Sequence, residues 1–330
     1  MKNYREVVGI DVSKKTIDAY CYHAQVHKEF KNDLVGYKSL LKWVLQATKE
    51  SAVFYCFENT GYYSLKLALY LHSKKVVFVE ESPLKIKRSS GIVKEKTDKL
   101  DAQVIARYGW LYREELIPST VKSSSHLELG RLLALRDQLV RNNAGLKGTL
   151  KEMKVLLLSS TTDLGCISLK RSIDYLTKQV KAIEIRIEEI IFDDISMSKN
   201  YELLKSMKGI GLVVACQLIY HTGNFTRFKS CRAFSSYCGT APFEHRSGTS
   251  IHRRKQCHYL GDRKMKSLLS MASVSAIQHD SELKLYYQKK LAEGKDKMLA
   301  INNVRNKLIA RAFAVVKRGT LYVVLQNYAA

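Results

Sequence analysis

The chain is poor in prolines, in clustered cysteines and in long apolar runs, and each shortage excludes a class of protein. Only three prolines interrupt 330 residues, which favours long helices over an architecture of short strands and turns. The seven cysteines are scattered and form no CxxC pair, so neither a disulfide framework nor a zinc knuckle is predicted. No apolar run approaches the roughly 18 residues of a membrane span. With no signal-peptide pattern at the start, we expect a cytoplasmic, nucleoid-associated protein.

Acidic residues are also scarce relative to basic ones. The sequence holds 55 Lys and Arg against 31 Asp and Glu, a formal net charge of +24. Such an excess indicates a polyanionic partner, either nucleic acid or an anionic membrane surface. Residues 201–330 carry 22 basic and 7 acidic residues, and a smaller basic cluster surrounds Asp98 and Asp101. Charge in both halves of the chain favours nucleic acid, and we expect no membrane partner.

The first part of the chain, residues 1–115, alternates strand and helix patterns. Short apolar runs predict strands at 7–10, 16–22, 26–30, 53–57 and 76–79. Helical periodicity predicts helices at about 37–47, 63–72 and 98–108. Short links between the first three strands suit antiparallel hairpins, and the later strands suit βαβ units. The predicted fold class is therefore α/β, a mixed sheet with helices on its faces, followed by all-α parts.

Residues 116–196 form a second part, with two heptad seams typical of coiled-coil helices. The first seam comprises Leu132, Leu135, Leu139, Leu146 and Met153, with Asn142 and Thr149 at the remaining seam positions. The second comprises Ile173, Leu176, Val180, Ile183, Ile187 and Ile190. The pair is either an oligomerisation element or an intramolecular helical hairpin, and the pattern alone does not choose. Residues 197–330 are predicted to form a basic, helical third part.

Four acidic residues of the first part stand where catalytic carboxylates are useful. Asp11 and Glu58 each close a predicted strand, while Asp98 and Asp101 lie three apart at the start of a predicted helix. Residues at i and i+3 share a helix face, so both aspartates can point toward the strand ends. An all-oxygen set of this kind suits Mg²⁺, or Mn²⁺, in phosphodiester chemistry. The alternative for any one of them is a helix cap or a solvated surface charge.

Basic residues flank the last two acids in the sequence. They are Lys85, Lys87, Arg88, Lys94, Lys96 and Lys99. They either guide a phosphate toward the carboxylates or compensate their charge on a surface loop.

The third part contains a pattern typical of a helix-hairpin-helix element, with Gly209 and Gly211 at its turn. Such a turn exposes backbone N–H groups at a helix N-terminus, where a phosphate binds without sequence readout. The alternative is an ordinary glycine turn between two helices. The last predicted helix, about 298–317, places Arg305, Lys307 and Arg311 among apolar residues, which indicates core packing on one side and phosphate contact on the other.

Residues 242–250 are polar and are predicted to form a loop. Basic residues are dense from here to Lys266, and the candidate phosphate contacts are Arg246, Arg253, Arg254, Lys255, Arg263 and Lys264. A serine among cations can act as a nucleophile, because they stabilise its alkoxide and a phosphorane-like transition state. Spacing does not choose between Ser247, Thr249 and Ser250, and a plain phosphate hydrogen bond is the alternative. Cys257-His258 lacks the spacing of a metal site and is interpreted as structural or as a phosphate contact.

These blocks occur in one order along the chain. Residues 9–14, 58–63 and 97–102 carry the four acids, and 209–211, 239–242, 247–248 and 261–263 follow. Together they resemble, over nearly the whole chain, the insertion-sequence transposases related to the Piv DNA invertase (the one-hundred-and-ten group). The resemblance implies a RuvC-like domain at 1–115, a coiled-coil linker at 116–196 and a helical serine-bearing domain at 197–330.

The resemblance also implies roles for single residues. Asp11, Glu58, Asp98 and Asp101 would bind Mg²⁺ as a DEDD tetrad, and Ser247 would attack the DNA phosphodiester. It further implies a structured guide RNA from the element's own non-coding end, and assembly as a dimer or tetramer. Because the serine and the acids lie in different parts of the chain, we expect a composite site.

Two other functions remain open from the residues alone. A Holliday-junction resolvase would use the same four acids with a metal-activated water and leave no covalent intermediate. A non-enzymatic architectural protein would bind DNA through the glycine turn and the basic helices.

Overall fold

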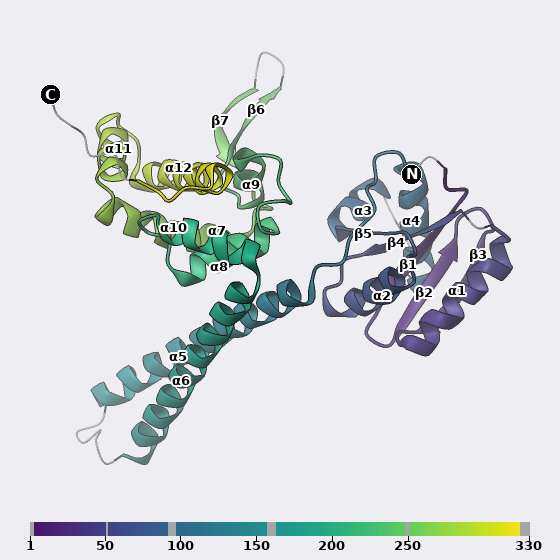
Figure 1. The fold of residues 1–330 in the computed structure, drawn as a ribbon, viewed down its shortest axis with the longest axis horizontal. Helices are drawn as coiled ribbons and strands as arrows, with labels where there is room; N and C mark the ends of the chain where they lie inside the picture. The colour runs from purple at the N-terminus through teal and green to yellow at the C-terminus, as the bar shows by residue number, and fades with distance from the viewer. Residues whose placement is uncertain (1–2, 51, 92–96, 157–162, 248–250, 324–330) are drawn as a thin grey trace. The chain divides into compact units, whose positions relative to one another are not determined.

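The structure is a computed structural model that describes residues 3–50, 52–91, 97–156, 163–247 and 251–323 (Figure 1). For residues 245–247 and 251–254 it describes the backbone alone. The contacts divide the chain into two compact units, residues 1–122 and 123–330, and each unit is described by itself.

The first unit is built on a mixed sheet. Its strands are β1 (Glu6–Val12), β2 (Thr16–Cys21), β3 (Val26–Lys31), β4 (Val53–Glu58) and β5 (Phe78–Glu81). They lie in the order β3-β2-β1-β4-β5. The pairs β1–β2 and β2–β3 are antiparallel, whereas β1–β4 and β4–β5 are parallel. The predicted α/β fold with a mixed sheet is therefore confirmed.

Helices cover both faces of this sheet, and the alternation of side chains along the strands separates two cores. On one face, α1 (Leu34–Thr48) and α2 (Tyr62–Ser73) pack on Ile10 and Phe57. On the other face, α3 (Pro83–Ser89) and α4 (Asp98–Leu111) pack on Val7 and Cys56. Helix α3 was not predicted, although Pro83 at its first turn is a usual start signal. The last strand begins at Phe78, two residues later than predicted.

The second unit begins with two long helices, α5 (Ser124–Leu156) and α6 (Leu164–Asp193). They pair with each other in antiparallel fashion, because Arg136 binds Glu184 and Asn143 binds Thr177. The two seams therefore form a helical hairpin within one chain. The predicted α5 seam is partly wrong: Leu135 is 47% exposed, Asn142 and Thr149 are exposed, and the buried amide is Asn143. The strict heptad pattern misplaced them because a polar helix with few apolar residues fits neighbouring registers almost equally well.

The rest of the second unit is a helical domain with one β-hairpin. Its elements are α7 (Ile195–Lys205), α8 (Leu212–Thr222), α9 (Cys231–Tyr237), β6 (Pro242–Ser247), β7 (Ile251–Cys257), α10 (Arg263–His279), α11 (Ser281–Ala292) and α12 (Lys297–Arg318). Their common core includes Leu204, Leu218, Phe234, Leu269 and Leu308. None of the helices among the described residues is long and apolar enough to cross a membrane.

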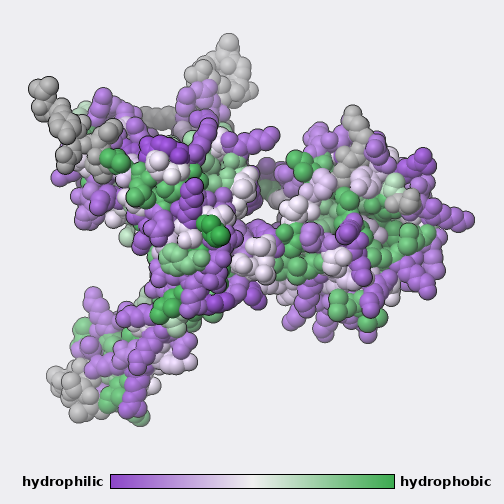
Figure 2. Space-filling model, in the orientation of Figure 1, coloured by the Kyte–Doolittle hydropathy of each residue, from purple (hydrophilic) through white to green (hydrophobic). Residues whose placement is uncertain are grey.

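The loop predicted at 242–250 is wrong over 242–247, where β6 pairs with β7 in an antiparallel hairpin. The register joins Ser247 to Ile251 and contains an irregularity between Phe243 and His245. Hydrophilic residues dominate this part of the molecule (Figure 2). The sequence of the two strands is polar and basic and lacks the apolar alternation of a strand, which is why it is typical of a loop.

Candidate functional site

Helix α4 lies unusually close to β1, and Gly9 makes this possible. A Cβ at position 9 would come within 2.2 Å of the Ala106 amide nitrogen and 2.4 Å of the Ala102 carbonyl oxygen. Thr97 caps the helix by accepting a hydrogen bond from the Leu100 amide. The first turn, which carries Asp98 and Asp101, therefore starts one turn before the contact with Gly9.

Asp11 and Glu58 are placed on the same face and at the same edge of the sheet. Ile10 pairs with Phe57, so Asp11 and Glu58 occupy the next position on two parallel strands. Gly9 and Cys56 both contact α4, as the close approach of Cys56 to Gly109 shows. Because side chains two residues apart share a face, Asp11 and Glu58 also lie on the α4 side. The structure thus brings all four predicted acids to one edge of the first unit.

Asp11 is the most perturbed of these carboxyls. Burial, together with the negative charges of Asp101, Asp98 and Asp18, raises the pKa of Asp11 to about 6. Asp98 and Asp101 lie close enough to Asp11 for their negative charges to act on its carboxyl group. A half-buried carboxyl beside like charges is a feature of metal-binding and catalytic sites.

Asp18 is a fifth acid at this edge, which the sequence did not indicate. It lies opposite Asp11 in the antiparallel register of β1 and β2, and it is 7% exposed. His27 of β3 binds it, with 2.8 Å between Nε2 and Oδ1. The pairing of β2 with β1 reveals Asp18, and no short-range pattern around residue 18 contains that information.

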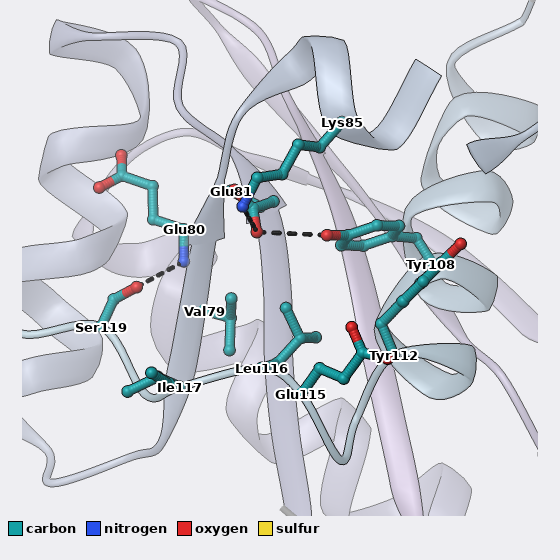
Figure 3. A pocket seen from close by; sticks show the side chains of 10 residues that line it. All are labelled: Val79, Glu80, Glu81, Lys85, Tyr108, Tyr112, Glu115, Leu116, Ile117 and Ser119. Carbon is teal, nitrogen blue, oxygen red and sulfur yellow. Dashed lines mark hydrogen bonds and ion pairs between the residues drawn. The ribbon is translucent and has the colours of Figure 1, made fainter. Parts of the chain in front are cut away.

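Glu81 is a second acid that sequence reasoning missed, although it closes β5 as Glu58 closes β4. The two glutamates pair in the parallel register, and both raise the pKa of the Cys56 thiol, an effect to which burial contributes most. Tyr108 donates to Glu81 over 3.2 Å, and Lys85 lies 3.1 Å from the same oxygen (Figure 3). A cavity of about 260 Å³ lies beside Glu81, lined also by Tyr112, Glu115, Leu116, Ile117 and Ser119.

The four predicted acids suit a divalent metal by the chemistry of their side chains. Carboxylate oxygens are the ligands that Mg²⁺ and Mn²⁺ prefer. The negative charges of Asp98 and Asp101 repel that of Asp11 and help to raise its pKa, and a bound cation would offset this repulsion. Among the residues that the structure describes, however, no three Asp, Glu, His or Cys side chains converge closely enough to ligate one ion. Binding would have to draw the carboxylates inward.

The predicted phosphate contacts of the first unit are only partly within the described residues. Lys87 and Arg88 lie exposed on the last turn of α3. Lys94 and Lys96 lie outside the described residues.

The predicted glycine turn between two helices is present, joining α7 to α8, and it fits both the helix-hairpin-helix interpretation and that of an ordinary turn. Gly209 has a φ of +87° and packs against α10, since a Cβ there would lie 2.4 Å from the Ala272 carbonyl oxygen. Gly211 precedes α8 and has open space around it. Gly209 therefore allows the turn to pack against α10. Gly211 leaves the N-terminus of α8 accessible to a phosphate.

The next candidates lie on the basic β6–β7 hairpin, and the structure describes the side chains of only some of them. Ser247 ends β6, and for Ser247, Arg246, Arg253 and Arg254 the structure gives only a backbone position in the strands. Lys255 forms an ion pair with Glu244 of the facing strand.

Two further candidates lie at the start of α10. Arg263 is exposed, whereas Lys264 forms an ion pair with Asp137 of α5. Lys264 thus already holds one anion within the unit.

Both ends of the hairpin are held by asparagines of α12. Asn302 and Asn306 donate to the Thr240 carbonyl oxygen over 2.9 and 3.0 Å. The Thr240 hydroxyl donates to Asn306 over 3.0 Å, and Cys257 at the end of β7 donates to the same carbonyl. This polar clamp fixes the base of the strand that carries Ser247.

A set of carboxylates at one sheet edge and a basic hairpin are both typical of proteins that act on a nucleic-acid backbone. Family comparisons agree: a DEDD transposase profile of the IS110 group matches residues 8–157, and the profile described as Transposase IS116/IS110/IS902 family matches residues 201–288. The chain belongs to this family of transposases, and it is a DNA recombinase by class.

Curated relatives extend over most of the chain. It is 26% identical over 318 residues to the pilin gene-inverting protein of Moraxella bovis, covering 94% of this chain and 95% of that protein. The protein of the same name from Moraxella lacunata is 26% identical over 317 residues, with 94% and 95% coverage. An uncharacterized 43.6 kDa protein of insertion element IS110 from Streptomyces coelicolor is 28% identical over 164 residues, 50% of this chain and 39% of that protein.

Proposed function

We propose that this transposase cuts and exchanges the DNA strands of an insertion sequence through a serine nucleophile, Ser247. The four acids Asp11, Glu58, Asp98 and Asp101 act with it as a metal-binding tetrad. The single observation that carries the acidic half is geometric: Asp11 and Glu58 follow paired positions of β1 and β4, and the contact at Gly9 holds α4, which carries Asp98 and Asp101, against β1. The family profile that covers the acids bears the DEDD name, which supports dependence on a divalent metal.

The reaction would proceed by transfer of a phosphoryl group to the serine. The Ser247 oxygen attacks the phosphorus, one P–O ester bond of the DNA breaks, and the serine proton leaves to solvent or to a neighbouring base. Cations of the hairpin and of α10, such as Arg246 and Arg263, would hold the phosphate and offset its developing charge. A divalent metal held by the tetrad, Mg²⁺ in our proposal, would stabilise the phosphorane and the leaving oxygen.

Ser247 and the tetrad belong to different units, so the proposal requires that both units act on one phosphodiester. The N-terminus of α8 after Gly211 and the exposed Lys87 and Arg88 of α3 would hold further backbone phosphates. Such contacts are independent of sequence and provide affinity rather than target choice.

Trapping of a covalent protein–DNA adduct tests the serine directly. Labelled DNA carrying an element end is incubated with the full chain and Mg²⁺, and the adduct is resolved under denaturing conditions. We expect an adduct with the wild type and with Thr249→Ala and Ser250→Ala, and none with Ser247→Ala. An adduct that persists in Ser247→Ala would overturn the serine assignment.

The same assay separates the two alternatives. A resolvase that uses a metal-activated water would cut DNA without an adduct, and Ser247→Ala would still cut. An architectural DNA-binding protein would show neither product, and Asp11→Asn would leave its DNA binding and its function unchanged.

Inversion of a DNA segment is a second candidate outcome of the same chemistry. It is favoured by the two relatives that match 94% of the chain and are named pilin gene-inverting proteins. A plasmid that carries the element with its flanks between two reporters distinguishes inversion from insertion and excision.

A structured guide RNA and a dimer or tetramer complete the proposal, and both rest on the family resemblance. Sequencing of RNA that copurifies with the full chain tests the guide, which should map to the non-coding end of the element. Light scattering of the purified chain, with and without that RNA, tests the oligomeric state.

A further inference from the structure

Arg305 is a buried cation for which the described residues supply no anion. It lies on α12 with 4% of its surface exposed, and its hydrogen bond is made by Nη1, which donates to Asn302 Oδ1 over 3.2 Å. Its Nε is buried and has no partner within the described part of the chain. Burial lowers the pKa of the Arg305 guanidinium. A guanidinium in this state is costly, because the described residues offer it one neutral acceptor in place of its water.

Arg311, six residues further along the same helix, shows the usual solution to this problem. It lies 3.2 Å from the buried Asp280 and also pairs with Glu282. The ring of Tyr322 contacts its guanidinium. One helix therefore carries a compensated arginine and an uncompensated one, and only the second lies at the hairpin base.

The surroundings of Arg305 belong to the polar clamp. Asn302, which accepts its hydrogen bond, also donates to the Thr240 carbonyl at the start of the hairpin. Asn302 also donates to the Cys257 sulfur, at the other end of the hairpin, over 3.8 Å. The sequence of the hairpin is itself basic, with Arg246, Arg253, Arg254 and Lys255 on its two strands.

We propose that Arg305 binds a backbone phosphate of the nucleic acid at the base of the β6–β7 hairpin. A guanidinium donates two parallel hydrogen bonds to a phosphate, and the unpartnered Nε is one of the two donors that this geometry uses. The bound phosphate would supply the missing anion and would position the strand beside the hairpin of Ser247. The inference rests on the proposed function in that a nucleic acid is the substrate, but not on the identity of the nucleophile.

Paired substitutions on α12 test the proposal. Arg305→Met removes an unpaired buried charge, so its Tm should rise, whereas Arg311→Met leaves Asp280 unpaired and should lower the Tm. Affinity for a short DNA duplex of mixed sequence is measured against salt in EDTA, so that no strand is cut. Loss of one phosphate contact should reduce the slope of log K against log salt by about 0.9 in Arg305→Met. The slope of Arg311→Met should equal that of the wild type.

A second arm uses inorganic phosphate alone, and it decides the question even if the duplex does not bind. The Tm gain in phosphate, relative to chloride of equal ionic strength, should be smaller in Arg305→Met than in the wild type. Arg305→Lys keeps the charge and should retain part of the gain. Equal salt slopes and equal phosphate gains in wild type and Arg305→Met would overturn the inference and leave Arg305 as a structural residue. If the wild type does not bind the duplex but its Tm gain in phosphate exceeds that of Arg305→Met, the result would instead contradict the proposed substrate.

Discussion

Gly9 of β1 and Ala106 of α4 are in contact so close that no side chain fits between them. A Cβ on residue 9 would lie 2.2 Å from the Ala106 amide nitrogen, and the neighbouring atoms are backbone, which cannot rotate away. We predict that Gly9→Ala displaces α4 and with it Asp98 and Asp101. Overpacking of this kind costs about 1–3 kcal/mol. Chemical unfolding should show that loss, and strand cleavage should fall more steeply than DNA binding.

Gly145→Ala is the matched control. Gly145 lies within α5 and has no atom within 4 Å of an added Cβ. Alanine in a helix interior is favoured over glycine by about 0.5–1 kcal/mol, so this variant should gain stability and keep activity. A Gly9→Ala protein with wild-type stability and cleavage would show that the approach of α4 to β1 does not place the acids.

The raised pKa of Asp11 predicts a pH-dependent stability of the metal-free protein. Its folded-state pKa of about 6 exceeds the ordinary value of 3.8, so the folded protein holds this proton more tightly than the unfolded chain. The contribution of Asp11 to stability is therefore fully present below about pH 4 and is lost as the pH rises through about 6. Asp11→Asn should consequently raise the Tm at pH 8 relative to the wild type, and the two proteins should converge at acid pH.

Divalent metal provides the complementary measurement. Mg²⁺ at pH 8 should raise the Tm of the wild type, because it offsets the repulsion among Asp11, Asp98 and Asp101. The same addition should leave the Tm of Asp11→Asn almost unchanged, and cleavage by that variant should be lost. Equal Mg²⁺ responses in the two proteins would show that the tetrad does not hold the ion through Asp11.

The acids show how much of the site could be predicted from the sequence. Asp11 and Glu58 follow apolar runs, and Asp98 and Asp101 share a helix face, so local patterns were sufficient to select them as candidates. Asp18 and Glu81 were missed because their place at the edge depends on which strand lies beside which. Pairing between strands is a long-range property that a short apolar run does not encode.

The β6–β7 hairpin, in contrast, could not be predicted from the sequence. The sequence of residues 242–257 is rich in charged and polar residues, so the two-residue period that indicates a strand is absent. The clamp that fixes the hairpin base joins Thr240 to Asn306, which are 66 positions apart. Such a contact leaves no mark in local composition. The helix α12 that carries Asn306, in contrast, was predicted at about 298–317 from its sequence.

The clamp yields a prediction about the serine hairpin. Asn306→Asp replaces the amide that donates to the Thr240 carbonyl with an acceptor, leaving two oxygens face to face. We expect a loss of about 1–3 kcal/mol in unfolding free energy. Adduct formation should fall through kcat, with little change in DNA affinity, because the hairpin is displaced while its charges remain. Asn303→Asp on the same helix is the control for the added charge, and a similar loss of kcat there would contradict the role of the clamp.

The sequence pattern and the structure place different residues in the seam between α5 and α6. Asn143 is 8% exposed, donates to the Thr177 hydroxyl over 3.0 Å, and has a buried Oδ1 without a partner among the described residues. Leucine removes that unpaired oxygen and fills the seam, so Asn143→Leu should raise the free energy of unfolding by about 1 kcal/mol. Asn142, which the heptad pattern placed in the seam, is exposed, and Asn142→Leu should change stability by no more than about 0.5 kcal/mol. Urea unfolding of the two variants checks both values, and a larger gain from Asn142→Leu would restore the register predicted from the sequence.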